Sequence, residues 1–289
     1  MIRGDGRYDL PGADIAWCPG CGNFGILSLV KSVLQELGKD PKEVVLVSGI
    51  GQAAKAPHYL KANVFNGLHG RAIPAAVGIK ASNPDLTVIV ESGDGDMYGE
   101  GGNHFLHAMR KNPDITCFVH DNMVYGLTKG QASPTSRKGF ITPVQVHGVS
   151  ETPFNPLAVA IATGATFVGR VFVGHAEEAK EVMKEAILHR GFSLVDIFQP
   201  CVTYNKLNTY SWFRDHTRPL PEGHDPSDRL KALSLSFSDD PLYTGIFYRR
   251  EGEPTFEDVC GAYIREKSPL FTRKADLEDI RDFVEGKRV

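Results

Sequence analysis

Short apolar runs alternate with longer amphipathic segments along most of the chain. The runs are rich in β-branched residues and end in Gly, Asp, Asn or Pro, a pattern that predicts strands. They cover 43–51, 86–96, 115–122 and 192–201. The segments with apolar side chains at helical spacing predict helices, and they cover 24–37, 71–82, 100–111, 155–163 and 175–190. This alternation predicts an α/β fold in which a parallel sheet is flanked by helices.

Polar residues follow the expected strands directly, at 49–52, 93–96, 121–122 and 200–201. Cys18 and Cys21 precede the first expected helix. In open α/β sheets, ligands collect where strands end and helices begin. We therefore expect all of these residues to border one crevice.

The end of the chain has a different composition. From residue 205 onward it is rich in Pro, Asp and Arg and carries two short helical patterns, 254–266 and 275–286. No linker divides the chain before that point. We therefore expect one α/β domain over 1–204, followed over 205–289 by an extended C-terminal arm that contacts another subunit.

Composition narrows the class of protein. The chain has 289 residues, 42% of them hydrophobic and 23% charged, with a formal net charge of -3. Lys and Arg are scattered, so we expect no nucleic acid or membrane as a partner. The N-terminus lacks the apolar core of a signal peptide, and no apolar run approaches the about 20 residues that span a bilayer. These features predict a cytoplasmic protein.

Two of the five cysteines form a C-x-x-C pair, Cys18 and Cys21. In the cytoplasm such a pair indicates metal or redox chemistry rather than a structural disulfide. Cys117 lies within an expected strand and Cys260 within a helical pattern, each among apolar neighbours. We interpret these two as small buried hydrophobic residues. The apolar stripe over 159–172 is likewise interpreted as core.

The stretch from Gly93 to Asn122 carries the most chemical information. It is not a dinucleotide fingerprint, because Tyr98 stands where the third glycine of G-x-G-x-x-G would be, and a P-loop motif is absent. Asp94 and Asn122 instead place one carboxylate and one amide oxygen at the tips of two expected strands. Such oxygens suit Mg²⁺ bound to a diphosphate, and small Gly93 and Gly95 permit close approach of the phosphates.

This stretch resembles the thiamine diphosphate signature, in which GDG is followed after a helix and a strand by Asn-Asn. Asp121 stands at the first Asn position. The resemblance implies that Asp94 and Asn122 bind Mg²⁺ through their side chains and Val124 through its carbonyl. Asp96 contacts the cofactor in this reading, or alternatively caps the next helix. The residues implied in cofactor binding are Gly51, Gln52, His69, Gly93, Asp94, Gly95, Asp96, Asn122, Val124, Gly126 and Leu127.

Five further motifs resemble the β subunit of 2-oxoacid:ferredoxin oxidoreductases of the 2-oxoglutarate type. They are "WCPGCG" (17–22), "SGIG" (48–51), "GLHGR" (67–71), "YGLTKGQASPTS" (125–136) and "QPCVTYN" (199–205). The resemblance implies thiamine diphosphate-dependent oxidative decarboxylation of a 2-oxoacid to an acyl-CoA, with electrons passing through an iron-sulfur cluster to ferredoxin. It also implies an α subunit that carries the pyrimidine-binding half of the site, and an assembly with two copies of each subunit.

Two side chains in these motifs are candidate catalytic residues. His69 in "GLHGR" is placed to donate a hydrogen bond to a phosphate or to the reacting carbonyl group. Lys129 in "LTKGQ" is placed to hold a substrate carboxylate. The competing interpretations are a loop histidine without a role and a solvated surface lysine.

In the family that the chain resembles, four cysteines hold a 4Fe-4S cluster. Cys18, Cys21 and Cys201 match three of them, but Gln52 stands at the remaining position. A carboxamide oxygen is a poor ligand for iron that prefers thiolate. We therefore expect a cluster with one labile iron that interconverts between 3Fe-4S and 4Fe-4S forms, and a zinc or empty site is the alternative.

Two other functions remain open at the level of the sequence. One is a non-redox thiamine diphosphate decarboxylase or synthase subunit whose cysteines bind structural zinc. The other is a non-catalytic assembly or regulatory subunit.

Overall fold

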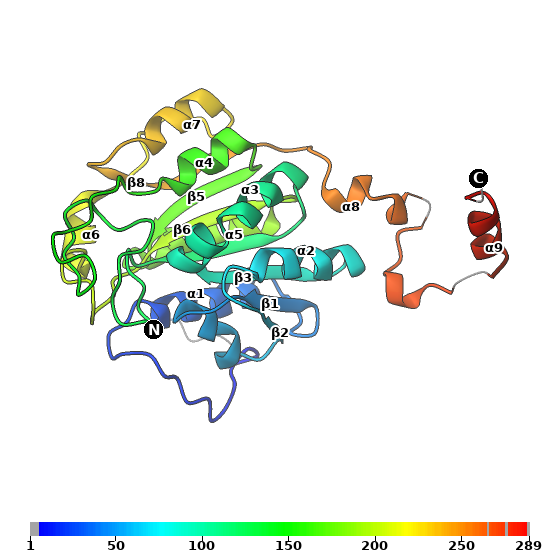
Figure 1. The fold of residues 1–289 in the computed structure, drawn as a ribbon, viewed down its shortest axis with the longest axis horizontal. Helices are drawn as coiled ribbons and strands as arrows, with labels where there is room; N and C mark the ends of the chain where they lie inside the picture. Colours follow the sequence, from blue (N-terminus) through cyan, green and yellow to red (C-terminus); the bar gives the residue numbers. More distant parts are fainter. Residues whose placement is uncertain (1–5, 265, 275–276, 288–289) are drawn as a thin grey trace.

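The computed structural model describes residues 6–264, 266–274 and 277–287, and it is built around one eight-stranded sheet (Figure 1). The strand order is β2-β1-β3-β4-β6-β5-β8-β7. The strands are β1 (Val44–Ser48), β2 (Asn63–Asn66), β3 (Thr87–Gly93), β4 (Thr116–Asp121), β5 (Phe167–Phe172), β6 (Ser193–Phe198), β7 (Thr217–Pro219) and β8 (Leu242–Arg249).

Helices connect these strands and cover the sheet. The α-helices are α1 (Asn23–Glu36), α2 (Ala72–Ser82), α3 (Gly102–Lys111), α4 (Pro156–Thr163), α5 (Ala176–Leu188), α6 (Tyr210–His216), α7 (Arg229–Ser236), α8 (Phe256–Val259) and α9 (Leu277–Glu285). Shorter turns are the 3-10 helices η1 (Ala53–Tyr59), η3 (Gly261–Tyr263) and η4 (Leu270–Thr272), and the π-helix η2 (Gly95–Glu100). None of the described helices is long and apolar enough to cross a bilayer.

The central strands are buried on both faces, as a parallel sheet between helix layers requires. Every residue of β1, β4, β5 and β6 is buried. One core joins the inner faces of α1 and α5 to the sheet, and a second joins α2, α3, α4 and α7 to its other face. The expected α/β class with a flanked parallel sheet is confirmed, with one antiparallel pair between β5 and β8.

The four strands expected from the sequence are confirmed, but four others were not expected. β5 lies in the apolar stripe that we interpreted from the sequence only as core, and β2, β7 and β8 are short or partly exposed. An exposed or half-buried strand lacks the continuous apolar run by which the central strands are recognised.

The expected boundary of the arm at residue 205 requires correction. β8 pairs with β5 and β7 pairs with β8, so the sheet continues to Arg249. Phe213 of α6 is fully buried and stacks on Phe172 and Phe198 of the sheet, with ring centroids 5.4 and 5.0 Å away. This fully buried ring packs the segment after residue 205 against the main core.

After β8 the described chain leaves the body, and Figure 1 shows it running outward to α9. The hydroxyl of Tyr263 donates to the carbonyl of Ala81 in α2, which holds the base of this segment. The expected helical pattern 254–266 contains α8 and η3, and the pattern 275–286 contains α9. Residues 265, 275 and 276 of these patterns lie outside the described residues.

Phe213→Ala is expected to lower the free energy of unfolding by about 3–5 kcal/mol, because it removes a fully buried aromatic ring and leaves a cavity. Chemical denaturation measures the loss. The matched control is Phe271→Ala, which changes a ring that is 77% exposed and should alter stability by less than about 0.5 kcal/mol. Equally small losses in both variants would show that α6 does not belong to the main core.

Candidate active site

The polar residues that follow the central strands lie at one edge of the sheet. Ser48 is in register with Glu91, Gly93 with His120, and Asp121 with Phe198. Neighbouring parallel strands therefore end together, and the loops that follow them border one another. The crevice expected from the sequence is formed in this way.

Asp96 is the centre of this edge. Its buried Oδ1 accepts hydrogen bonds from the amides of Ile50 and Gly70 at 3.1 and 2.7 Å and lies 2.5 Å from Nδ1 of His69, while its Oδ2 accepts the hydroxyl of Ser92 at 2.6 Å. One carboxylate thus joins three segments that are far apart in the sequence. Asp96 does not cap a helix, because it lies inside η2.

His69 lies between two carboxylates. Its Nδ1 contacts Asp96, and its Nε2 lies 3.2 Å from Oε2 of Glu100. Glu100 also accepts the hydroxyl of Tyr125 at 3.1 Å. The imidazole is therefore held on both sides. Glu100 and Tyr125 were not identified from the sequence, because nothing in their local pattern indicates a contact with His69.

Gly95 is required by packing. A Cβ at this position would lie 2.1 Å from the ring of Tyr125, closer than atoms can approach. Gly93 is less constrained, since its added Cβ would meet Ala53 only at 3.8 Å. The second glycine of the GDG turn is therefore small because Tyr125 crosses it, and this contact is a second reason for glycine besides the approach of phosphates.

Asp94 and Asp121 form a buried acidic pair at the ends of β3 and β4. The hydroxyl of Thr135 lies 2.8 Å from a carboxylate oxygen of each, at Asp94 Oδ2 and Asp121 Oδ1. A hydroxyl has one hydrogen and can donate it to only one of them. The second contact therefore requires a proton on a carboxyl group or a nearby cation.

Burial raises the pKa of Asp94 to about 6, although hydrogen bonds from Ser133 and Thr135 oppose the rise. Burial, followed by the charges of Asp196 and Asp94, holds the pKa of Asp121 well above its ordinary range. Desolvation and neighbouring negative charge both disfavour the ionised forms. The charge of Arg170 opposes the rise at Asp121 without cancelling it, so the site holds an excess of negative charge, as a cation-binding site does before its ion is present.

The groups expected to bind Mg²⁺ are chemically suited to hold a cation at this site. Asn122 follows β4, and its Oδ1 accepts the amide of Val124 at 3.0 Å in a tight turn through Met123, whose φ is 56°. A carboxylate, an amide oxygen and a backbone carbonyl are hard donors of the kind that Mg²⁺ takes. Among the described residues, no three His, Cys, Asp or Glu side chains form a metal-binding group; the expected set contains only one such side chain, Asp94.

The three cysteines of the expected cluster line one small cavity, of about 40 Å³. Gln52, Asn122 and Gly126, which the resemblance implies in cofactor binding, line it too. The sulfur of Cys18 accepts the Thr203 hydroxyl at 3.1 Å, and that of Cys201 accepts the Tyr204 amide at 3.4 Å. The three sulfurs share the cavity without forming a metal-binding group as they stand.

Several polar atoms around this cavity have no partner. Asn23 Nδ2, Gln52 Oε1 and Gln199 Oε1 are buried without a hydrogen bond, and all three residues line the cavity. Burial raises the pKa of Cys21 to about 11. Unpartnered polar groups and a desolvated thiol cost free energy in an empty cavity. This arrangement therefore suits a cavity that holds a bound group.

The remaining candidate residues lie in the loop after β4. Lys129 and Leu127 are exposed, and Lys129 adopts a φ of 79°, in the left-handed region. The amide of Gly130 donates to the carbonyl of Tyr125, which closes the turn.

Cys117 is fully buried, as expected, whereas Cys260 is only half-buried because it ends the short helix α8 away from the core.

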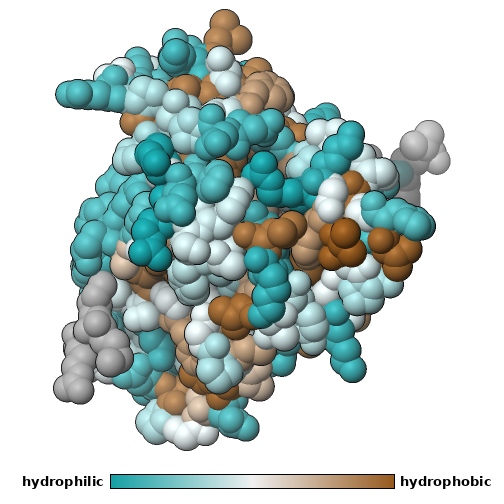
Figure 2. Space-filling model, turned by 90° about the vertical axis from the view of Figure 1, so that its left-hand side faces the viewer, coloured by the Kyte–Doolittle hydropathy of each residue, from teal (hydrophilic) through white to brown (hydrophobic). Residues whose placement is uncertain are grey.

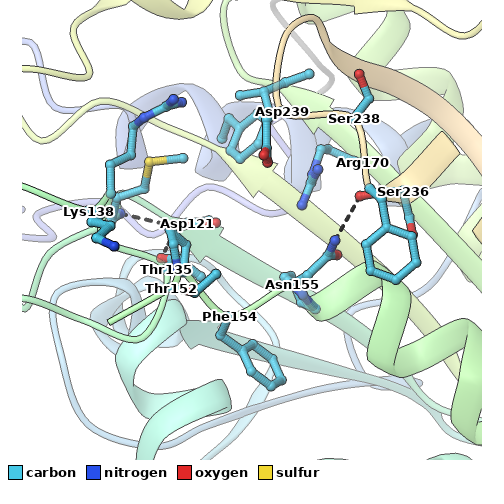
Figure 3. Close-up of a pocket in the computed structure, with 17 residues that line it drawn as sticks. Asp121, Thr135, Lys138, Thr152, Phe154, Asn155, Arg170, Ser236, Ser238 and Asp239 are labelled. Atoms are coloured by element: carbon cyan, nitrogen blue, oxygen red, sulfur yellow. Dashed lines mark hydrogen bonds between the residues drawn. The ribbon is translucent and has the colours of Figure 1, made fainter. Parts of the chain in front are cut away.

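A second cavity, of about 560 Å³, adjoins the acidic pair (Figure 3). Asp121 and Thr135 form part of its wall, together with Arg170 of β5. The side chain of Arg170 donates from Nε to Asp196 at 2.9 Å. Arg170 and Asp196 were not identified from the sequence, because Asp196 lies within a run that predicts only a buried strand and Arg170 within the apolar stripe interpreted as core.

Comparison with known proteins bears on this site. Residues 46–197 match the family described as thiamine pyrophosphate enzyme, C-terminal TPP binding domain. Residues 201–265 match the family described as the C terminal of the pyruvate ferredoxin oxidoreductase beta subunit. The chain therefore carries both parts in sequence order.

Individual relatives support the same family assignment. The subunit beta of a 2-oxoacid:ferredoxin oxidoreductase from Saccharolobus solfataricus is 44% identical over 94% of this chain and 92% of its own length. That of a 2-oxoacid:ferredoxin oxidoreductase 2 from Aeropyrum pernix is 40% identical over 91% of this chain and 90% of its own. A solved structure of 2-oxoglutarate:ferredoxin oxidoreductase from Magnetococcus marinus, with 2-oxoglutarate, coenzyme A and succinyl-CoA bound, matches with a TM-score of 0.91 and 37% identity over 100% of this chain and 97% of that one.

Asp94→Asn is expected to stabilise the cation-free protein near neutral pH. The pKa of Asp94 is about 6 in the folded protein and 3.8 ordinarily, so the folded state binds the proton more tightly than the unfolded chain. This contribution, on the order of 3 kcal/mol, is complete below the ordinary pKa and is lost as the pH rises through about 6. Asparagine stays neutral at every pH and still accepts the Thr135 hydrogen bond.

Chemical unfolding in the presence of a chelator, at several values between about pH 4 and 7, measures this effect. Asp215→Asn is the matched control, because Asp215 is exposed. The advantage of Asp94→Asn over the unmodified protein should grow with pH. An advantage that is the same at all pH values would contradict a proton-retaining Asp94.

Proposed function

Because the chain belongs to the β subunits of the 2-oxoacid:ferredoxin oxidoreductases, we propose that the edge described above is the diphosphate half of a thiamine diphosphate site. The enzyme oxidatively decarboxylates a 2-oxoacid and forms an acyl-CoA. These relatives do not favour the alternative of a non-redox decarboxylase with structural zinc, nor that of a non-catalytic subunit.

The observation that carries the proposal is the buried pair of Asp94 and Asp121, which share one hydroxyl and have raised pKa values. A Mg²⁺ ion on Asp94 Oδ, Asn122 Oδ1 and the Val124 carbonyl would supply the missing positive charge. It would also tie the cofactor's diphosphate to the ends of β3 and β4. The thiamine ring, when bound, supplies the electron sink through which a 2-oxoacid loses CO₂.

His69 and Lys129 act on the substrate side in this proposal. Asp96 holds the imidazole of His69 in one orientation through Nδ1, and Nε2 would donate to the substrate in place of its contact with Glu100. Lys129 is exposed on the turn that Tyr125 and Gly130 close, and its ammonium group would capture the substrate carboxylate.

We assign the small cavity to an iron-sulfur cluster held by Cys18, Cys21 and Cys201. Support comes from their shared cavity, the two donors to their sulfurs and the unpartnered Oε1 of Gln52. Gln52 stands at the position that a fourth cysteine would occupy in the family. The cluster would hand electrons to ferredoxin, and its fourth iron would be labile because a carboxamide replaces a thiolate.

The site requires a partner. Ile50, Leu68 and Leu127 flank it and are 39, 75 and 42% exposed. Figure 2, which looks onto the side that carries the loops after the strands, shows apolar patches among polar surface there. Exposed apolar groups around a cofactor site fit an α subunit that supplies the pyrimidine-binding half. We propose two copies of each subunit, with the chain after Arg249 as a further contact, in the cytoplasm, where thiols stay reduced.

Asn122→Ala is expected to abolish the binding of thiamine diphosphate to the assembled complex, because it removes one of the few protein ligands to Mg²⁺. Calorimetric titration with the cofactor and Mg²⁺ measures it. Asn83→Ala, which changes an asparagine at the end of α2, is the control and should bind normally. Near-normal cofactor binding by Asn122→Ala would remove the assignment.

Lys129→Ala is expected to raise the KM for the 2-oxoacid at least about tenfold and to leave cofactor binding intact, because an ion pair with the substrate is lost. Initial rates and cofactor titration on the same preparation separate the two effects. Lys42→Ala, which changes an exposed lysine before β1, serves as the control. An unchanged KM for Lys129→Ala would return this lysine to the solvent.

Anaerobically purified complex is expected to contain iron in this subunit, with an EPR signal of a 3Fe-4S cluster after mild oxidation. Gln52→Cys should suppress that signal and give a four-iron cluster that resists oxidation, because the labile iron gains a thiolate. Cys117→Ser, which changes a buried cysteine away from the cavity, should leave the signal in place. Zinc instead of iron, or no signal assignable to this subunit in either redox state, would refute the cluster.

A further inference from the structure

The cavity beside Asp121 is separate from the catalytic residues. It is enclosed by β5 and the end of β6 below, by 152–156 leading into α4 on one side, and by 236–242 between α7 and β8 on the other. None of the proposed ligands to the metal ion or the cluster lines it, nor does His69 or Lys129, although Asp121 and Thr135 belong to both its wall and the neighbouring acidic pair. Its volume of about 560 Å³ lies within the range of small-molecule sites.

Arg170 gives this cavity its chemical character. The side chain is nine-tenths buried, its Nε donates to Asp196 at 2.9 Å, and its guanidinium lies 4.6 Å above the ring of Phe198. Asp196 also accepts the hydroxyl of Tyr98, so both of its oxygens are in use. The arginine is thereby held in one orientation from below.

The terminal amino groups of Arg170 remain available. Within the described part of the chain they make no hydrogen bond, and Figure 3 shows them pointing into the open centre of the cavity. A guanidinium fixed through Nε presents its other edge as a fork of parallel donors. That geometry matches a phosphate or carboxylate group.

Neighbouring groups add positive potential. Asn155 caps α4 by accepting the amide of Ala158 at 3.0 Å, so the positive end of this helix borders the cavity. Arg137 and Lys138 line another wall. Two carboxylates oppose this potential, Asp239 from an exposed position and Asp121 from a buried one. Solvent screens the negative charge of Asp239 more than that of Asp121.

The rest of the lining is mostly apolar. It includes Met123, Phe154, Phe198, Phe237 and Leu242. Phe237 is 62% exposed at the rim, whereas Met123, Phe198 and Leu242 are buried. A purely inorganic anion would leave this surface uncovered.

We propose that this cavity is a second ligand site, which binds an organic anion with its phosphate or carboxylate on Arg170 and its apolar or aromatic body against Phe237 and the apolar lining beside it. The site is distinct from the proposed thiamine diphosphate site. Thr135 lies in the cavity wall and also contacts Asp94, so the two sites are neighbours.

Titration calorimetry on the purified complex tests this without turnover, so its outcome does not depend on the proposed catalytic site. The probes are adenosine monophosphate, phenylacetate and inorganic phosphate. We expect one of the two aromatic anions to bind more tightly than inorganic phosphate. Which of them binds shows whether the head group is a phosphate or a carboxylate.

Arg170→Gln should weaken that binding about tenfold or more, because a charge-assisted pair of hydrogen bonds is lost. Arg110→Gln, which changes an exposed arginine of α3, should bind as the unmodified complex does. Removal of Arg170 alone leaves the carboxylate of Asp196 buried without a cation, and the single variant can fail to fold for that reason. In that case the double variant Arg170→Gln with Asp196→Asn removes both charges and replaces it.

A blocking variant leaves Arg170 in place. Thr152 lines the cavity and is exposed, and Thr152→Trp should fill the entrance and also weaken binding. The proposal is overturned if neither aromatic probe binds, or if binding is unchanged in both the arginine and the tryptophan variants. A cavity closed by the partner subunit would give the first of these results.

Discussion

One hydroxyl between two buried carboxylates sets the main constraint on this protein. Thr135 lies within hydrogen-bonding distance of both Asp94 and Asp121, but it can satisfy only one of them as a donor. Burial of two acids side by side costs several kcal/mol unless a proton or a cation compensates them. In the proposed site this compensation is a divalent cation on the adjacent oxygen donors, which would bring the diphosphate to this edge of the sheet.

The fold makes this arrangement rigid. Parallel strands in register end together, so Asp94 and Asp121 are neighbours because β3 and β4 are. Asp96 then ties the loops after β1 and β2 to the same turn through three hydrogen bonds or short contacts, and a fourth joins it to Ser92 of β3. A carboxylate with that many donors is held in one orientation. His69 therefore reaches its position through Asp96 rather than through its own loop.

Much of this architecture could be predicted from the sequence. The central strands are recognisable as continuous apolar runs, and GDG with a following Asn indicates the thiamine diphosphate-binding domain, which the family match confirms, while the metal site itself stays a prediction. The contacts that complete the site could not be predicted, because they join distant segments: Thr135 meets Asp94 across 41 residues, and Tyr98 meets Asp196 across 98. β8 was missed for a related reason, since its half-buried residues lack a clear period and its pairing with β5 is antiparallel.

The proposed site depends above all on a divalent cation between the ends of β3 and β4. Crystals of the assembled complex grown with thiamine diphosphate and Mn²⁺ in place of Mg²⁺ would test for it through the anomalous scattering of manganese. We expect one strong anomalous peak within coordination distance of Asp94 Oδ, Asn122 Oδ1 and the Val124 carbonyl, bridging to the diphosphate. A diphosphate bound at this edge with no manganese peak there, or a peak at another group of ligands, would show that the cation is not held as proposed.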